Sequence, residues 1–261
     1  MLITFEGLPG AGKSTQATLL AQCLRDHGHP VSILPDLATL NIEPLAATLT
    51  ELLRSGGDPF LRTGDAITDT LITAAIRADL VTTVLDPALA ATPGGIVIED
   101  RGIHTMASYA IASLLREHRA PPAVALDWLD ALTTLAGPRP TLALWLRLPP
   151  DIAARRANQR NAGTDPPLTG EQRAYLTWVH HAYQLLTDWD PQLTVLDVTD
   201  LDPVQTHHAI HQTLDRIDHT DDIGVPACTK GRHDTAWSRA SVGRSPAHRP
   251  AVPEPKTGSL I

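Results

Sequence analysis

Cysteine is nearly absent from this 261-residue sequence, which contains only Cys23 and Cys228. Two cysteines do not suggest a disulfide framework, and this scarcity fits a reducing compartment. The sequence also lacks any run of about 18 apolar residues, the length that a membrane-spanning helix requires. It begins with an apolar run and has no basic segment before it, unlike a signal peptide. We therefore expect a cytoplasmic protein with no membrane as its partner.

Basic residues are also scarce in most of the chain. The formal net charge is −8, but residues 224–261 contain six Lys or Arg and two acidic residues, which leaves a net charge of −12 for residues 1–223. An acidic body is unlike a general nucleic-acid-binding surface, so we expect no nucleic acid as a partner. A site for an anion must then be built locally, from a few arginines and oriented backbone N–H groups.

The apolar residues that are present indicate the fold class. Five apolar runs show no alternation of polar and apolar residues, as expected for strands of a parallel sheet that helices cover on both faces. Helical segments separate these runs, and this order predicts an α/β fold with a doubly wound, five-stranded parallel sheet. In such sheets ligands bind beyond the carboxyl ends of the strands. The predicted strands are Leu2–Glu6, Val31–Leu34, Gly95–Glu99, Thr141–Leu148 and Leu193–Val198.

The end of the chain differs from the rest. The periodicity stops at about Asp218, and the remainder is rich in Pro, Gly, Ser, Arg and His. We predict a folded domain over residues 1–218 and a disordered tail over residues 219–261.

Three histidines lie close together shortly before this boundary. His207, His208 and His211 have a helical spacing that could bind a metal ion. Because no cysteine or carboxylate pattern lies near them in the sequence, a solvated helix face is the favoured interpretation.

The most informative stretch is Gly7–Ser14, which matches the phosphate-loop pattern G-x-x-x-x-G-K-[ST] between a predicted strand and a predicted helix. Its glycines allow backbone N–H groups to surround a phosphate chain, and the helix N-terminus adds partial positive charge. We expect Lys13 to reach the β- and γ-phosphates of ATP, and the hydroxyl of Ser14 to bind Mg²⁺. The predicted nucleotide-binding residues are Gly7, Leu8, Pro9, Gly10, Ala11, Gly12, Lys13, Ser14 and Thr15.

A second polar group follows the third predicted strand, which ends in Glu99, Asp100 and Arg101. A carboxylate at such a strand end can hold Mg²⁺, usually through water, so Asp100 and Glu99 join Ser14 as candidate metal-binding residues. The planar guanidinium of Arg101 can bind a phosphoryl group. An ordinary strand end with a surface ion pair is the alternative.

Arg77 lies in a predicted helix over residues 64–85. It is off the apolar stripe and shares its face with Thr70 and Thr73, so this cluster could bind a second phosphate. The pattern alone nevertheless favours a solvated helix face. The apolar stripe consists of Ile67, Leu71, Ala74, Ala78, Val81 and Leu85.

Three arginines follow the fourth predicted strand. Arg155, Arg156 and Arg160 belong to a helix that opens at Pro150 and leads into a loop-like segment, Asn161–Leu168. This pattern is typical of a flap whose arginines neutralise charge as a phosphoryl group moves. A basic helix end that complements the helix dipole is the alternative.

Taken together, these segments resemble the thymidylate kinase family of nucleoside monophosphate kinases over about residues 1–215. Five segments carry the resemblance, and their order along the chain is more specific than any one of them. They are Phe5–Thr15, Leu71–Arg77, Asp100–Gly102, Pro150–Arg156 and Val179–Tyr183. The resemblance implies a P-loop kinase domain and a homodimer.

The resemblance also assigns roles to the candidate residues. The family divides by whether its catalytic arginine lies in the phosphate loop or in the flap, and this loop has no arginine. We therefore expect the flap-arginine type, with Arg77 and Arg101 on the acceptor phosphate. The expected catalytic residues are Lys13, Arg101, Arg156 and Arg160, and the expected substrate-binding residues are Arg77, Arg101, Thr73 and Tyr109.

The sequence departs from the family pattern on the acceptor side. An acidic residue of the family loop is replaced by Pro9, and the stacking aromatic residue by Thr73. The tyrosine after the Asp-Arg pair is Gly102, and the residue that reads the base edge is Met106. The second strand continues as Pro35-Asp36-Leu37 without the family's arginine. The residues predicted to bind ATP therefore match the family pattern better than the residues of the base pocket do.

Three functions follow as hypotheses. The first is transfer of a phosphoryl group from ATP–Mg²⁺ to a nucleoside monophosphate, with dTMP converted to dTDP, for which positioning and charge neutralisation suffice. The second is a P-loop kinase for a nucleoside or another small acceptor. The third is a nucleotide-binding module without catalysis.

Overall fold

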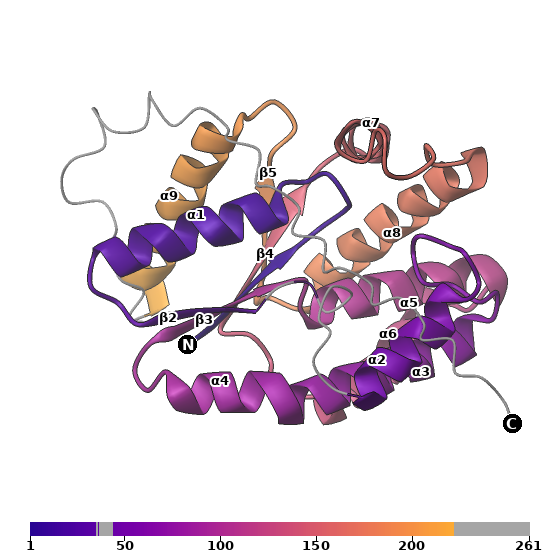
Figure 1. Ribbon diagram of the computed structural model, residues 1–261, viewed down its shortest axis with the longest axis horizontal. Helices are drawn as coiled ribbons and strands as arrows, with labels where there is room; N and C mark the ends of the chain where they lie inside the picture. The colour runs from indigo at the N-terminus through magenta and orange to yellow at the C-terminus, as the bar shows by residue number, and fades with distance from the viewer. Residues whose placement is uncertain (35, 37–43, 222–261) are drawn as a thin grey trace, which may run out of the picture. The chain divides into compact units, whose positions relative to one another are not determined.

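Residues 1–34, 36 and 44–221 are described by this computed structural model, and they form a parallel five-stranded sheet with helices on both faces (Figure 1). The strand order is β2-β3-β1-β4-β5. Each strand covers most of one predicted run, which confirms the doubly wound α/β fold. The strands are β1 (Leu2–Glu6), β2 (Val31–Leu34), β3 (Ile96–Asp100), β4 (Leu142–Arg147) and β5 (Leu193–Asp197).

Helices fill the connections between the strands. Helix α1 packs against β1, β2 and β3 and contacts α9, whereas α5 contacts α3, α6 and α8 (Figure 1). In the described part of the chain, no helix combines the length and the apolar character needed to cross a membrane. The helices are α1 (Lys13–Asp26), α2 (Pro44–Arg54), α3 (Ala66–Leu80), α4 (Asp86–Ala91), α5 (Ile103–Glu117), α6 (Pro122–Leu135), α7 (Pro150–Arg160), α8 (Gly170–Trp189) and α9 (Pro203–Asp221), with a π-helical segment at Val81–Leu85 between α3 and α4.

The predicted domain boundary lies within α9. This helix continues to Asp221, three residues beyond the predicted end of the folded domain. The rest of the predicted tail lies outside the described residues, as do Pro35 and Leu37 of the second strand end.

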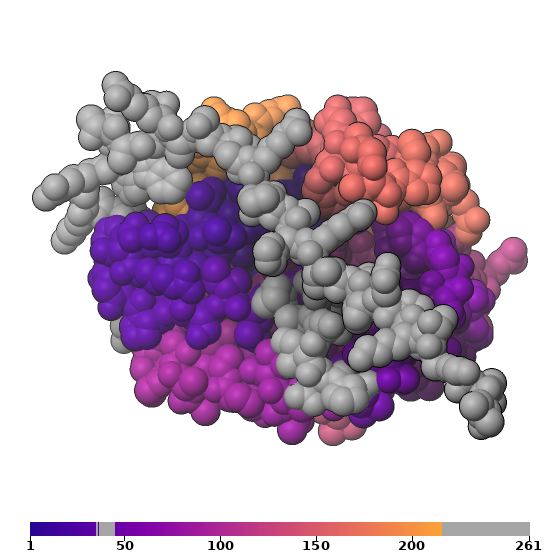
Figure 2. All heavy atoms as spheres, viewed as in Figure 1, coloured from indigo at the N-terminus to yellow at the C-terminus, as the bar shows by residue number. Residues whose placement is uncertain are grey.

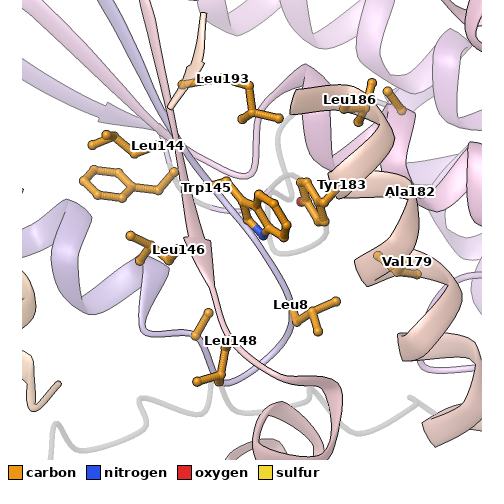
Figure 3. Packing of buried hydrophobic residues seen from close by; sticks show 14 of the residues in the cluster. Leu8, Leu144, Trp145, Leu146, Leu148, Val179, Ala182, Tyr183, Leu186 and Leu193 are labelled. Atoms are coloured by element: carbon orange, nitrogen blue, oxygen red, sulfur yellow. The ribbon is translucent and has the colours of Figure 1, made fainter. Parts of the chain in front are cut away.

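The core lies on both faces of the central strands. Leu144 and Trp145 are neighbours on β4 and point to opposite faces of the sheet (Figure 3). The indole of Trp145 stacks on the ring of Tyr183 from α8, with 5.2 Å between ring centroids and 13° between planes. Because both faces are covered, the central strands are mostly apolar on both faces, which is why the sequence showed runs rather than alternation.

The orientation predicted for helix α3 is wrong. Three residues of its apolar stripe are open to solvent, since Ile67 is 43% exposed, Leu71 is 50% exposed and Ala78 is also exposed. Arg77, by contrast, is only 2% exposed and Thr70 is also buried. The helix turns its polar face inward because buried partners and a pocket lie there, so the solvated-face interpretation of Arg77 fails.

A similar correction applies to the histidines of α9. His208 is exposed, as predicted, but His211 is only 5% exposed and His207 is half-buried. The face of α9 that carries His211 packs against α1, so it is not a solvated face.

Candidate active site

The sheet topology brings the two predicted phosphate-handling segments together. β1 pairs with β3 in parallel, and Phe5 lies opposite Asp100 in the register. The carboxyl ends of these strands therefore meet at one edge of the sheet, where the loop Gly7–Gly12 leads into α1.

The loop owes its shape to glycine. Gly7, Gly10 and Gly12 have φ values of 132°, 82° and 92°, a region that other residues rarely adopt. A Cβ atom on Gly10 would lie 2.9 Å from the backbone oxygen of Ala153 and 2.9 Å from the Cβ of Arg156. Helix α7 therefore packs directly on the phosphate loop.

A tyrosine on α8 fixes the start of the loop. The backbone N–H of Gly7 donates a hydrogen bond to the hydroxyl of Tyr183 at 2.9 Å. The same hydroxyl lies 2.9 Å from that of Thr105, which donates to Glu6 at 2.6 Å.

We predict that Tyr183→Phe destabilises the fold by about 1–3 kcal/mol, because the buried N–H of Gly7 loses its acceptor. The variant should also bind ATP more weakly, since the loop is no longer held in place. Urea denaturation and ATP titration measure the two effects. Tyr175→Phe is the matched control: its hydroxyl bonds to α5 at the Tyr109 carbonyl, so stability should fall while ATP affinity is unchanged. Equal loss of ATP affinity in both variants would contradict the prediction.

Lys13 lies within the loop that it is predicted to serve. Its ammonium donates to the carbonyls of Gly7 and Leu8, both at 3.0 Å. Burial lowers the pKa of Lys13 to about 7, and the nearby Arg101 acts in the same direction. The loop thus holds a poorly solvated cation that a phosphate chain would stabilise.

Ser14 and Asp100 are joined as a magnesium site requires. The Ser14 hydroxyl donates a short hydrogen bond to the Asp100 carboxylate. The other carboxylate oxygen, Oδ1, is buried and has no hydrogen-bond partner among the described residues. A hydroxyl and a carboxylate oxygen with unused acceptor capacity are suitable groups for Mg²⁺.

Glu99 does not join this pair. It forms a buried ion pair with Arg77, in which one guanidinium nitrogen lies 3.2 Å from the carboxylate and the other lies closer. Neighbouring residues of a strand point to opposite faces, so Asp100 faces Ser14 while Glu99 faces α3. Burial raises the pKa of Glu99, although Arg77 opposes this shift. Glu99 therefore binds Arg77 and does not face the predicted magnesium site.

Arg101 occupies a strained position at the edge of the sheet. Its φ of 69° lies in the left-handed region, and its N–H donates to the carbonyl of Phe5 at 3.1 Å. Its guanidinium forms an ion pair with Asp36 at 2.6 Å. An acceptor phosphate that bound Arg101 would therefore compete with a carboxylate.

The residue after Arg101 explains one departure from the family pattern. A Cβ atom on Gly102 would lie 2.7 Å from the Cγ2 of Thr4 and 2.8 Å from the Oε1 of Glu6. Thr4 and Glu6 fill this space, so a tyrosine does not fit here unless the Thr4 and Glu6 side chains move.

A pocket of about 840 Å³ opens beside the loop and brings all four predicted substrate-binding residues together. Pro9 and Met106, two of the departures noted above, also line it, as does Asp36. The predicted substrate-binding residues are Arg77, Arg101, Thr73 and Tyr109.

The sequence analysis missed an aromatic wall in this pocket. Phe60 lines the pocket and lies 6.0 Å from Tyr109 and 5.6 Å from Tyr175, between ring centroids. The guanidinium of Arg62 lies 4.1 Å above the ring of Tyr175. Only two phenylalanines occur in the sequence, and the place of Phe60 in a polar loop was an available signal.

The three arginines of α7 have different surroundings. Arg155 is exposed and pairs with Asp151 one turn earlier, at 2.9 Å. Arg156 packs on Gly10 and donates to the carbonyl of Thr199 at 3.2 Å. Arg160 lines the pocket. Arg156 and Arg160 are thus next to the predicted donor and acceptor sites, and Arg155 is not.

A buried polar chain supports the site from behind, and the sequence analysis did not identify it. His104 donates to Asp190 at 2.9 Å and lies 3.7 Å from Glu6, and Arg139 binds Asp190 at 3.0 Å. Burial alone would lower the pKa of His104, but the hydrogen bond with Asp190 and the negative charge of Glu6 outweigh it and raise the pKa to about 9.

We predict that the protonated His104 stabilises the fold by roughly 3 kcal/mol below pH 6.5, the pKa of an unperturbed histidine. This contribution should be lost as the pH rises through about 9. The pKa of Lys13 is lowered, so its contribution to stability changes with pH in the opposite direction. The test therefore compares the stability of the wild type with that of His104→Asn, in which Lys13 is unchanged. Urea denaturation at pH 6.5 and 9.5 should show the wild-type advantage over His104→Asn shrinking with pH. An advantage that is constant with pH would disprove the assignment.

The fold and the loop define the class of protein, a P-loop nucleotide-binding protein with a doubly wound parallel sheet. The family model described as thymidylate kinase matches residues 5–210. The chain belongs to the thymidylate kinase family.

Individual relatives agree with this result. A thymidylate kinase of Synechococcus sp. is 35% identical over 199 residues, which are 75% of this chain and 84% of the relative. A thymidylate kinase of Pseudomonas putida is 32% identical over 217 residues, 83% of this chain and 94% of the relative. The crystal structure of a thymidylate kinase from Ehrlichia chaffeensis has the same fold, with a TM-score of 0.57 and 20% identity over 82% of this chain and 98% of that one.

Proposed function

We propose that the protein transfers a phosphoryl group from ATP to a nucleoside monophosphate, with dTMP as the acceptor and dTDP as the product. The observation that carries the proposal is the position of Arg101, which lines a large pocket and lies next to the Ser14–Asp100 pair at the same sheet edge. Family membership supports the same reaction.

Each part of the site has a role in this reaction. Lys13 and the N–H groups of the loop would hold the β- and γ-phosphates of ATP. Ser14 and Asp100 would hold Mg²⁺, which neutralises developing charge on the phosphates when bound. Arg156 and Arg160 would neutralise the transferring group, because α7 lies against the loop and reaches the pocket.

The acceptor would bind in the pocket with its phosphate on Arg101. Its base would lie against Phe60 and Tyr109, which offer the aromatic surface that Thr73 lacks. Arg77 would act mainly through its ion pair with Glu99, since its charge is already matched. This assignment revises the expectation that Arg77 holds the acceptor phosphate.

An assay of ADP release with ATP–Mg²⁺ and a panel of acceptors tests the proposal. The panel contains dTMP, dUMP, the other nucleoside monophosphates and the free nucleosides. We expect rapid, saturable turnover with dTMP, and Phe60→Ala should raise the KM for dTMP more than that for ATP. Absence of turnover with every monophosphate would reject the proposal.

Two ion pairs favour a second candidate, a kinase for an acceptor without a phosphate. Two of the pocket arginines already face carboxylates, Arg101 with Asp36 and Arg77 with Glu99. A neutral hydroxyl acceptor would leave these pairs intact, whereas a phosphate dianion must compete with Asp36. Turnover with a nucleoside but not with its monophosphate would establish this candidate. ATP binding without turnover of any acceptor would instead indicate a non-catalytic module.

We further propose a homodimer that covers α2 and α3, with small nucleotides as the other partners. Apolar side chains on these contacting helices are exposed, namely Leu45, Leu52, Ile67 and Leu71. Exposed apolar patches of this kind mark protein interfaces. Light scattering after gel filtration should give the mass of a dimer, and Leu71→Asp should give a monomer. Val204→Asp, at an exposed position of α9, is the control.

A further inference from the structure

Helices α1 and α9 bring three metal-ligating side chains together although they are distant in sequence. Cys23 on α1 meets His207 and His211 on α9, and their ligating atoms all lie within 4.8 Å of one another. Cys23 and His211 are buried, at 6% and 5% exposure. The indigo α1 and the orange α9 are neighbours in Figures 1 and 2. The fold therefore places a cysteine beside these histidines, although none lies near them in the sequence.

The two histidines already point at each other. Their Nε2 atoms are 3.0 Å apart, with the rings nearly perpendicular at 88°. Zinc bonds of about 2.0–2.1 Å in a tetrahedral site place two nitrogen ligands about 3.3 Å apart. The histidine pair therefore needs almost no movement to hold one ion between its nitrogens.

The sulfur of Cys23 completes the set. A thiolate bound at about 2.3 Å and an imidazole nitrogen at about 2.1 Å are separated by about 3.6 Å around a tetrahedral ion. All three ligating atoms lie within 4.8 Å, so small side-chain rotations bring them to this spacing. One fixed point on α1 and two on α9, one helical turn apart, are enough to define the position of the ion.

A further histidine on α1 lies next to Cys23 but is not part of the cluster. His27 lies one turn after Cys23, with its Nδ1 4.0 Å from the cysteine sulfur and 2.7 Å from the Cys23 carbonyl. The sequence thus repeats one spacing on both helices, Cys23-x₃-His27 and His207-x₃-His211. Because the Nδ1 of His27 already contacts the Cys23 carbonyl, the fourth position of a tetrahedral ion would be filled by water.

We propose that Cys23, His207 and His211 form a zinc site between α1 and α9, with water as the fourth ligand. A thiolate with imidazoles suits zinc, which binds sulfur and nitrogen ligands. It does not suit magnesium or calcium, which bind oxygen ligands. The ion is structural, because Cys23 lies ten residues after Lys13, about 15 Å along the helix from the loop. The site does not depend on the proposed function.

The consequence of the site is a link between α9 and the helix that carries the phosphate loop. Gln16 already joins the start of α9 to α1 by donating to the carbonyl of Pro203 at 2.8 Å. The zinc ion would add a second link at the far end of α1. Two separated links fix the relative rotation of the helices, which one link cannot do.

Cobalt substitution tests the site directly. The full chain, without a polyhistidine tag, is treated with chelator and reductant and titrated with Co²⁺ alone. We expect one Co²⁺ per chain, with the thiolate-to-cobalt charge-transfer band and the strong visible bands of a tetrahedral centre. Zn²⁺ should displace the cobalt and should raise the melting temperature of the metal-free protein.

Matched variants identify the ligands. Cys23→Ser should remove the charge-transfer band, and His211→Ala or His207→Ala should weaken Co²⁺ binding at least about tenfold. His208→Ala and Cys228→Ser are the controls and should bind as the wild type does. His208 is a suitable control because it is exposed on the same helix and contacts Gln212 instead.

The proposal fails if the wild type shows no charge-transfer band, or if Cys23→Ser retains it. It also fails if zinc leaves the melting temperature unchanged. Circular dichroism of each variant separates loss of the site from loss of the fold. Because His207 is only half-buried, His207→Ala keeps the test valid if Cys23→Ser unfolds.

Discussion

Replacement of Lys13 by Met should lower the turnover of dTMP with ATP by at least about a thousandfold. The ammonium lies inside the loop, held by two loop carbonyls, and methionine keeps the length of the side chain without its charge. The fold should survive, because burial already disfavours this charge and lowers the pKa of Lys13 to about 7. Steady-state kinetics and the urea midpoint measure the two effects.

A control on α7 shows that the loss is specific. Arg155→Ala removes a cation from an exposed position paired with Asp151, and its turnover should stay close to that of the wild type. Near-normal turnover of Lys13→Met would remove the basis for assigning the donor phosphates to this loop. A large loss in Arg155→Ala would mean that general charge, rather than position, controls the rate.

The second large effect concerns stability. Arg77→Ala should destabilise the fold by about 3–5 kcal/mol, because it leaves the carboxylate of Glu99 buried without its partner. The double variant Arg77→Met with Glu99→Leu should regain most of this loss, since an apolar pair of similar volume can replace a buried ion pair. Urea denaturation of the wild type, the single variant and the double variant measures this recovery.

The same variants separate structure from acceptor binding at Arg77. If the double variant is stable but still binds dTMP weakly, Arg77 contacts the acceptor as well as forming the ion pair with Glu99. If its KM for dTMP is that of the wild type, the arginine acts only through the ion pair. A loss of less than about 1 kcal/mol in Arg77→Ala would contradict the buried pair itself.

Features that depend on neighbouring residues could be predicted from the sequence. The loop Gly7–Ser14 is contiguous, so its glycines, its lysine and the helix that follows are visible without the fold. The five strands were found because each is a short apolar run between helical segments. The placement of Asp100 beside Ser14 followed from the rule that parallel strands end at one edge.

Other contacts between distant segments, which no such topological rule covers, could not be predicted. The helical pattern alone favoured a solvated face for Arg77, because the sequence does not show that Glu99 lies opposite it on β3. The same limit applies to Cys23 and His211, which share no local pattern and meet only because α1 and α9 pack together. The face that a helix buries is set by its partners, and apolar periodicity alone does not identify them.

Gly102 has a consequence for the evolution of the acceptor pocket. Where the family pattern has tyrosine, this chain has no side chain, and the methyl group of Thr4 and the carboxylate of Glu6 occupy the space. Substitution of Gly102 by tyrosine alone would therefore be unfavourable unless Thr4 or Glu6 also changed. Single substitutions that change the acceptor pocket are thus expected to keep position 102 small.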